Sequence, residues 1–429
     1  MRPSGGRILL IPAADLPLLY FAVAHVCLAL AFAALTIRPD LPGGYFHHPR
    51  MIALVHLVTL GWISASILGA FYIVGPLALG MPLPAGTRDR WAFGAYIVGL
   101  GGMVSHFWIG EYSGMAWSAG LVVLAILHVA VRAWLGLRLA QVPWGVKLHV
   151  ALAFANILGA GIFGIAVGLN RQYGWWPWSP MSAAFAHGHF AAIGWPVMMV
   201  VGLSYRLIPM IVPAAMPTRA SIALSAVCLE IGMLVLVLTM LRNGAWTVAG
   251  AVLVVAGLAS FVSHVRAIVR QKRLPPAALR RPDWPTWQTH LAFAWLLVSA
   301  ITGVALTFPI SVALAIPLGW IYGTAGLVGF LSQIVVGIQG RLLPLHGWYR
   351  MFEAGGMQPP QRSAHTLGSH ALSKWILLAW TCGVPLLAAG LAASVPALVC
   401  VGSASLLGGT LLNAAQVFII ATAQHNRSS

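Results

Sequence analysis

Apolar residues run along this chain in long, nearly unbroken stretches, separated by short segments rich in turn-forming or basic residues. About 20 apolar residues are enough for one helix to cross a bilayer. The pattern therefore predicts an all-α integral membrane protein whose twelve transmembrane helices form a single membrane domain, residues 1–429. The predicted spans are 14–37, 51–79, 91–109, 115–139, 146–169, 181–212, 219–241, 245–270, 287–308, 311–344, 370–392 and 394–423.

The composition excludes several classes of protein. Of the 429 residues, 60% are hydrophobic and 7% are charged, whereas soluble domains carry roughly 25% charged residues. A soluble enzyme, a disordered chain and a disulfide-linked secreted scaffold are therefore excluded. The formal net charge of +17 does not indicate nucleic acid, because the basic residues fall mainly in loops between apolar runs. We expect membrane lipids as partners, and the oligomeric state stays open.

The basic residues also predict the orientation. If the N-terminus lies inside, 20 of the 24 lysines and arginines fall in inner segments. Only Arg38, Arg50, Arg171 and Arg242 fall in outer segments. Because loops that stay in the cytoplasm carry the excess of Lys and Arg, both termini are predicted to be cytoplasmic. The expected location is the inner (cytoplasmic) membrane of a bacterium.

Two of the predicted spans resemble each other in sequence. Residues 56–76 read HLVTLGWISASILGAFYIVGP, and residues 189–209 read HFAAIGWPVMMVVGLSYRLIP. Six positions are identical at an offset of 133, including His56 with His189 and Trp62 with Trp195. A third segment, VVGIQGRLLP at 335–344, matches residues 200–209 at a further offset of 135 and places Thr324 opposite His189. We expect three four-helix repeats around a pseudo-threefold axis, at about 14–139, 146–270 and 287–423.

Histidines supply the candidate chemistry, because polar side chains inside a bilayer are costly and usually functional. His56 and His189 are predicted at equal depth near the outer side, and two such imidazoles suit the axial positions of a heme iron. His187 lies about 200° around the helix from His189 and therefore indicates a separate ligand. His47, His48 and His106, also near the outer side, are candidates for copper. The alternative for each is a hydrogen-bonded histidine that only packs.

These motifs resemble a known family. The stretch AHGHFAAIGWPVMMVVGLSYRLIP at 186–209 is similar to the His-x-His helix of heme-copper oxidases and nitric oxide reductases, and residues 56–76 are similar to their first heme-binding helix. The resemblance implies a low-spin heme b held by His56 and His189, and a second, high-spin heme on His187. The chain departs from the family in two ways. Its His-x-His segment is in the sixth span rather than the tenth, and the three-histidine site for copper or non-heme iron has no counterpart.

The resemblance implies electron transfer or reduction of a small gas such as nitric oxide, with an electron-donor protein or a quinol as partner. Proton pumping is not expected, because a pump needs a relay of ionisable groups and Glu230 is the only clear carboxylate in the middle of a span. Catalytic residues stay unassigned. Two other classes stay open: a heme- or copper-handling or sensing protein on the same scaffold, and a transporter.

Overall fold

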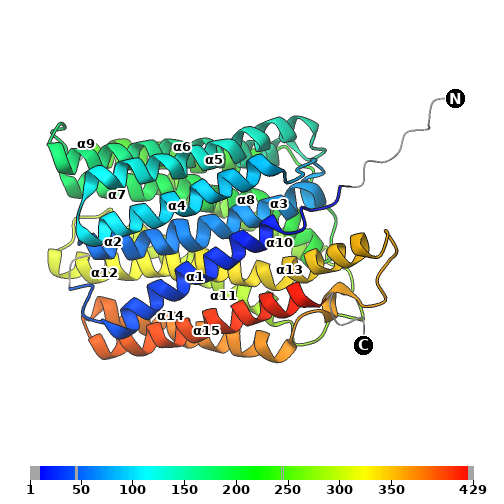
Figure 1. Cartoon of the computed structure of the whole chain (residues 1–429). Helices are drawn as coiled ribbons and strands as arrows, with labels where there is room; N and C mark the ends of the chain where they lie inside the picture. Colours follow the sequence, from blue (N-terminus) through cyan, green and yellow to red (C-terminus); the bar gives the residue numbers. More distant parts are fainter. Residues whose placement is uncertain (1–9, 44–46, 243, 245, 424–429) are drawn as a thin grey trace.

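The computed structural model describes residues 10–43, 47–242, 244 and 246–423, and in this part of the chain helices joined by loops are the regular structure, without strands (Figure 1). Twelve helices in it are long and apolar enough to cross a membrane. Nine are single helices: α1 (Leu16–Ile37), α4 (Thr87–Ile109), α5 (Tyr112–Leu139), α6 (Trp144–Tyr173), α9 (Ile222–Arg242), α10 (Thr247–Arg270), α11 (Trp284–Ala305), α14 (His370–Ala392) and α15 (Pro396–Thr422).

Each of the other three spans is composite, with a π-helical segment between two α-helices. The first is α2 (Pro49–His56), η1 (Leu57–Ser64) and α3 (Ala65–Leu79). The second is α7 (Pro180–Ala192), η2 (Ile193–Val197) and α8 (Met198–Ile211). The third is α12 (Val312–Thr324), η3 (Ala325–Ser332) and α13 (Gln333–Ala354), and a short turn, η4 (Ala364–Thr366), follows it. The sequence predicted that the third of these spans ends at 344, whereas α13 continues to Ala354.

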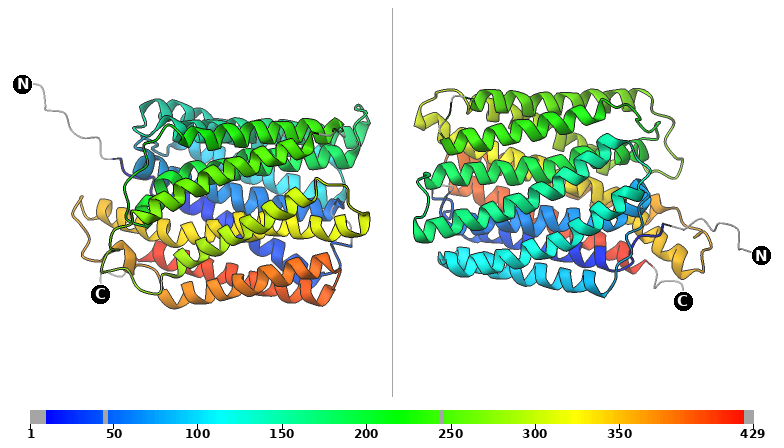
Figure 2. Two further views of the ribbon diagram at one scale, coloured as in Figure 1. Left: turned by 180° about the vertical axis from the view of Figure 1, so that it is seen from behind. Right: turned by 90° about the horizontal axis from the view of Figure 1, so that it is seen from above.

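The long helices run nearly parallel to one axis, and α1 begins at the same end of the bundle where α15 ends (Figures 1 and 2). Large aromatic side chains are exposed close to both ends of the helices. Trp108 and Trp246 lie near one end, and Trp91 and Trp144 near the other. Tryptophan is typical of the two interfaces between a membrane and water. The prediction of a multi-pass membrane protein with twelve spans is therefore supported by length, composition and side-chain distribution together.

The three composite spans form the core of the bundle. In their most apolar windows, 67%, 72% and 61% of the residues are buried inside the protein, against at most 50% in any of the other nine spans. Segment η1 packs against η3, and α3 packs against both α8 and α13. The nine single helices surround this core and leave much of their surface free for lipid.

The π-helical segments occupy matching places in the three composite spans. They end at Ser64, Val197 and Ser332, and these positions are related by the same two offsets that align the sequences. Ser64 Oγ donates to the Thr59 carbonyl at 2.8 Å, and Ser332 Oγ donates to the equivalent Leu327 carbonyl at 2.7 Å. Short π-helical insertions within α-helices often occur at functional sites.

Glycines allow each composite span to approach the single helix that precedes it. A Cβ added at Gly61 would lie 2.5 Å from Cys27 Cβ, and one at Gly202 would lie 2.3 Å from His149 Cβ. Small residues let transmembrane backbones pack closely. Trp62 and Tyr72, two aromatic residues of the first composite span, are fully buried in this packing.

Candidate functional site

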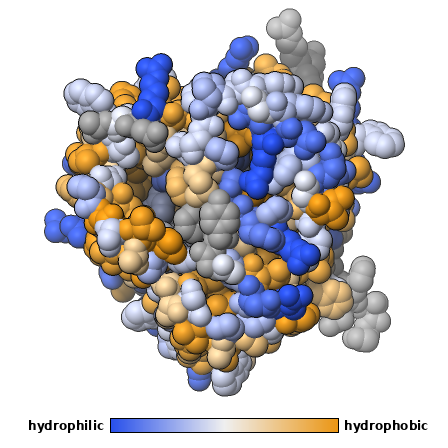
Figure 3. Space-filling model, turned by 90° about the vertical axis from the view of Figure 1, so that its left-hand side faces the viewer, coloured by the Kyte–Doolittle hydropathy of each residue, from blue (hydrophilic) through white to orange (hydrophobic). Residues whose placement is uncertain are grey.

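The predicted ligand histidines lie toward the end of the bundle whose loops carry few basic residues, here called the base-poor end. Figure 3 shows hydrophilic side chains across this end, with hydrophobic ones toward its rim. His56 is the last residue of α2, and His187 and His189 lie in the second half of α7. Both helices begin at this end with a proline in the first turn, where the missing N–H of proline costs no helical hydrogen bond.

The rings of His56 and His187 face each other between α2 and α7. Their centroids are 6.4 Å apart and their planes differ by 14°. Phe107 of α4 lies against His56, with ring centroids 4.8 Å apart, and Phe163 of α6 lies 6.1 Å from His187. A Cβ added at Gly164 would lie 2.6 Å from Cε1 of His187. The site is thus an imidazole pair with aromatic neighbours, and a glycine leaves space for one of the two rings.

This pair carries unused ring nitrogens. His56 Nδ1 bonds to the Ile52 carbonyl at 2.8 Å, and its Nε2 has no protein partner among the described residues. His187 Nδ1 is buried without a hydrogen-bond partner in the same part of the chain, and the His187 ring also interacts with the backbone of Ala160. Neither feature is diagnostic by itself, since His25 and His149 also bond to the preceding turn through Nδ1 and His346 Nδ1 is also buried without a partner. The pair is distinguished by the proximity of its two rings.

His189 makes a different contact from the one expected. Its Nε2 bonds to the Tyr322 hydroxyl of α12 at 3.0 Å, and the two rings stack with centroids 5.7 Å apart. His187 and His189 therefore point to different neighbours, as their helical spacing predicts. The described chain has no ring contact between His56 and His189, the pair expected to share one iron.

Tyr322 is the residue of this site that the sequence interpretation missed. It lies two positions before Thr324 and therefore matches His187 at the offset of 135. His56 contacts His187 and His189 contacts Tyr322, so the two pairs occupy matching positions between successive composite spans. The repeat alignment could have identified Tyr322, because it places this residue opposite His187.

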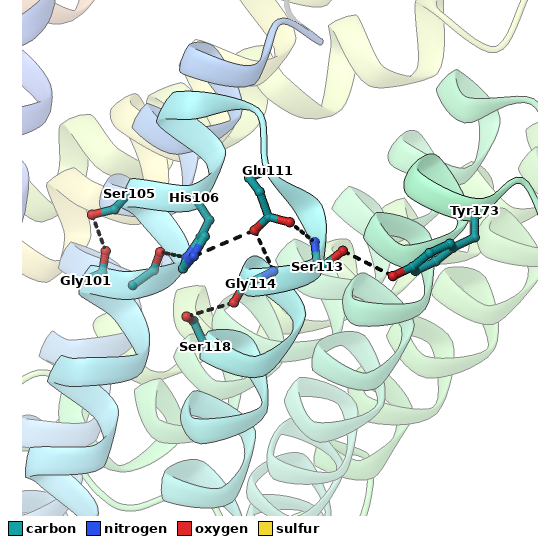
Figure 4. A network of polar contacts seen from close by, with 9 residues as sticks. Gly101, Ser105, His106, Glu111, Ser113, Gly114, Ser118 and Tyr173 are labelled. Atoms are coloured by element: carbon teal, nitrogen blue, oxygen red, sulfur yellow. Dashed lines mark hydrogen bonds and ion pairs between the residues drawn. The ribbon is translucent and has the colours of Figure 1, made fainter.

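His106, a copper candidate, lies in the last turn of α4, close to the start of α5 (Figure 4). Its Nδ1 bonds to the Gly102 carbonyl at 2.6 Å, and its Nε2 lies 3.7 Å from Oε2 of Glu111. The Glu111 carboxylate accepts hydrogen bonds from the backbone of Ser113 at 2.9 Å and of Gly114 at 2.6 Å. These N–H groups hold the pKa of Glu111 below its usual value. This arrangement caps helix α5.

The other two copper candidates have separate neighbours. His47 Nδ1 lies 3.1 Å from Nη1 of Arg171, and His48 Nδ1 accepts from the backbone N–H of Arg50 at the start of α2. Partial burial and the charge of Arg171 lower the pKa of His47, which keeps its imidazole neutral. Within the described ranges, no three His, Cys, Asp or Glu side chains converge as a metal site would require.

Polar groups in the middle of the spans bond across helices. His25 Nε2 accepts from the Asn413 amide at 3.0 Å, and Glu230 accepts from the Asn156 amide at 2.8 Å. Both contacts are the interhelical hydrogen bonds expected of polar side chains in a bundle. These groups are therefore explained by packing, unlike the His56–His187 pair.

No protein-family model matches the chain, and no curated protein is significantly similar to it.

Proposed function

We propose that this chain is a heme b-binding electron-transfer protein in which His56 and His187 are the axial ligands of one iron. The observation that carries the proposal is the facing imidazole pair with its vacant nitrogens. The 6.4 Å between the two ring centroids leaves space in which both imidazoles could hold one metal.

The surroundings support a bound heme. Histidine ligands usually fix their second ring nitrogen on a carbonyl or carboxylate, and Ile52 fills this role for His56. Phe107 and Phe163 offer aromatic surface, and Arg50 and Arg171 at the same end offer positive charge for propionates. A heme iron with two imidazoles has no vacant position, so the chemistry that it supplies is electron transfer. Reduction of nitric oxide would require an additional open site.

We further propose that the bundle consists of three related four-helix units. The matching ends of the π-helical segments, the matching glycine contacts and the matching pairs His56–His187 and His189–Tyr322 support this arrangement. The corresponding pair between the third and the first composite spans would be Thr324 and Leu54. Neither of these residues would ligate a metal there. In this interpretation one interface keeps two imidazoles, the second joins a histidine to a tyrosine, and the third has lost the site.

We propose that both termini face the cytoplasm, since 20 of the 24 basic residues then lie on the inner side. Proton pumping is not part of the proposal. Glu230 bonds to Asn156, and Asp89 is 2% exposed in contact with Arg132. Asp89 also contacts Tyr72 and His128, a local cluster in the first turn of α4, whereas a pump would need a relay of such groups across the membrane.

The test is a reduced-minus-oxidised optical spectrum with metal analysis, on the purified chain and four variants. His56→Ala and His187→Ala should each abolish the low-spin b signal, because one imidazole cannot hold a six-coordinate iron. His189→Ala should retain it, and Tyr322→Phe is the matched control. Loss in His189→Ala with retention in His187→Ala would instead establish the pairing suggested by the family resemblance.

Metal analysis separates the proposal from its alternative. Copper without heme, lost in both His56→Ala and His187→Ala, would favour a copper-handling protein that uses the same imidazole pair. A wild-type chain expressed with heme and copper available that contains neither iron nor copper would overturn the metal proposal and leave the pair with a packing role.

A further inference from the structure

A cavity of about 310 Å³ opens at the end of the bundle opposite His56, where the loops carry most of the basic residues. Its wall is formed by the end of α8, the start of α11, the middle of α13, the segment around η4 and the start of α14. The lining side chains that matter here are Arg280, Asp283, Trp284, Arg341, His365 and Ser373. Nothing in the proposed electron transfer uses this cavity.

Two buried donors in this wall have no acceptor. Nε of Arg341 and Nε1 of Trp284 are both buried without a hydrogen-bond partner among the described residues. Both groups donate and cannot accept. An unpaired buried donor costs about 1–3 kcal/mol, so a ligand that brought acceptor oxygens to this wall would be stabilised there.

The charged side chains of the wall favour an anionic ligand. Asp283 is the one carboxylate in the lining, and it already accepts from Arg341 and from Thr286. Arg280 adds a second guanidinium, which is exposed at the mouth. Burial, with a smaller contribution from Arg341, lowers the pKa of His365. Two arginines against one aspartate give the charged side chains of the lining a net charge of +1.

Apolar side chains line the remainder of the cavity, among them Leu207, Met210 and Ile338. A bare inorganic anion would gain nothing from this surface, whereas an amphiphile with an anionic head would. Basic pockets between transmembrane helices on the cytoplasmic side are typical sites for anionic lipid headgroups. Segment 271–283, which carries Lys272, Arg273 and Arg281 as well as Arg280, lies at the same end.

We propose that this cavity binds the phosphate of an anionic phospholipid, with Arg341 and Trp284 as buried donors and Arg280 at the mouth. The lipid would join α8, α11, α13 and α14, which come from different parts of the chain. The proposal is independent of heme binding, because the cavity and the His56–His187 pair lie at opposite ends of the bundle.

The experiment measures binding of phosphatidylglycerol to the purified full chain by native mass spectrometry, with thermal stability as a second readout. Trp284→Phe removes one donor and keeps an aromatic ring, and Arg280→Gln removes an exposed charge without unpairing Asp283. Each should weaken binding about tenfold, the effect of losing one charge-assisted hydrogen bond. Arg138→Gln, a basic residue of the same end outside the cavity, is the matched control and should bind as the wild type does.

The remaining measurements distinguish an anionic lipid from a free inorganic anion. Phosphatidylcholine should bind more weakly than phosphatidylglycerol, and inorganic phosphate alone should neither bind nor raise the thermal midpoint. Protection by inorganic phosphate equal to that by phosphatidylglycerol would overturn the lipid assignment in favour of a free oxyanion. Wild-type affinity for phosphatidylglycerol in both Trp284→Phe and Arg280→Gln would show that the cavity is not the binding site.

Discussion

The indole of Trp195 in η2 donates a hydrogen bond of 3.0 Å to the hydroxyl of Ser64 at the end of η1. Both residues are buried, and the bond joins two π-helical segments in the core of the bundle. Trp62 occupies the matching position in the first composite span, but its Nε1 has no hydrogen-bond partner in the described chain. The two tryptophans therefore differ in bonding although they are equally buried.

Trp195→Phe should destabilise the protein more than Trp62→Phe does. Both substitutions remove the same ring volume, but only the first removes a hydrogen bond, worth about 1 kcal/mol. Thermal unfolding of the two variants in detergent measures the difference. Equal losses of stability would mean that the bond to Ser64 contributes nothing.

Gly202→Ala should be strongly destabilising, because the new methyl group would lie 2.3 Å from Cβ of His149. Overpacking of this kind costs about 1–3 kcal/mol. Gly101→Ala on α4 is the matched control, since nothing lies within 4 Å of its added Cβ. That control should be neutral or stabilising by up to about 1 kcal/mol. Similar thermal midpoints for the two variants would contradict the close approach of α8 to α6.

Asp89→Asn should destabilise the N-terminal part of α4. Its carboxylate accepts from Tyr72 at 2.7 Å, from Arg132, and from the backbone N–H of Gly86 at 2.7 Å. Loss of one member of a buried ion pair costs about 3–5 kcal/mol. Because the Arg132 side chain is 24% exposed, the lower end is expected. The double variant Asp89→Asn/Arg132→Gln should recover part of the thermal stability, and no recovery would argue against coupling between the two residues.

Cysteine labelling should report opposite sides for two loops. In a Cys382→Ser background, Leu274→Cys should react with an impermeant maleimide only from the cytoplasm, and Trp175→Cys only from outside. Both positions are well exposed, at 92% and 61%, and the distribution of basic residues sets the expected sides. Labelling of both from one side would contradict the predicted number of spans between them, and exchanged sides would reverse the orientation.

Much of the fold was accessible from the sequence. Apolar runs of about 20 residues leave a chain little choice but to cross the bilayer as helices, so all twelve spans were predicted, although the third composite span is longer than expected. The alignment of the segments that follow His56 and His189 also identified the spans that turn out to form the core. Depth along the membrane follows from position in the chain, and the histidines were placed toward the correct end.

The neighbours of each histidine were decided only by the tertiary structure. Projection at 100° per residue assumes an unbroken α-helix. This assumption holds for His187 and His189 within α7, but η1 begins directly after His56 and η3 directly after Thr324. A π-helical turn contains more residues and rotates everything beyond it. The contact of His56 with His187 rather than His189, and of His189 with Tyr322, depends on how α2, α7 and α12 pack. Equal depth is a property of the sequence, whereas the direction of a side chain and its partner on another helix depend on packing between segments distant in the chain.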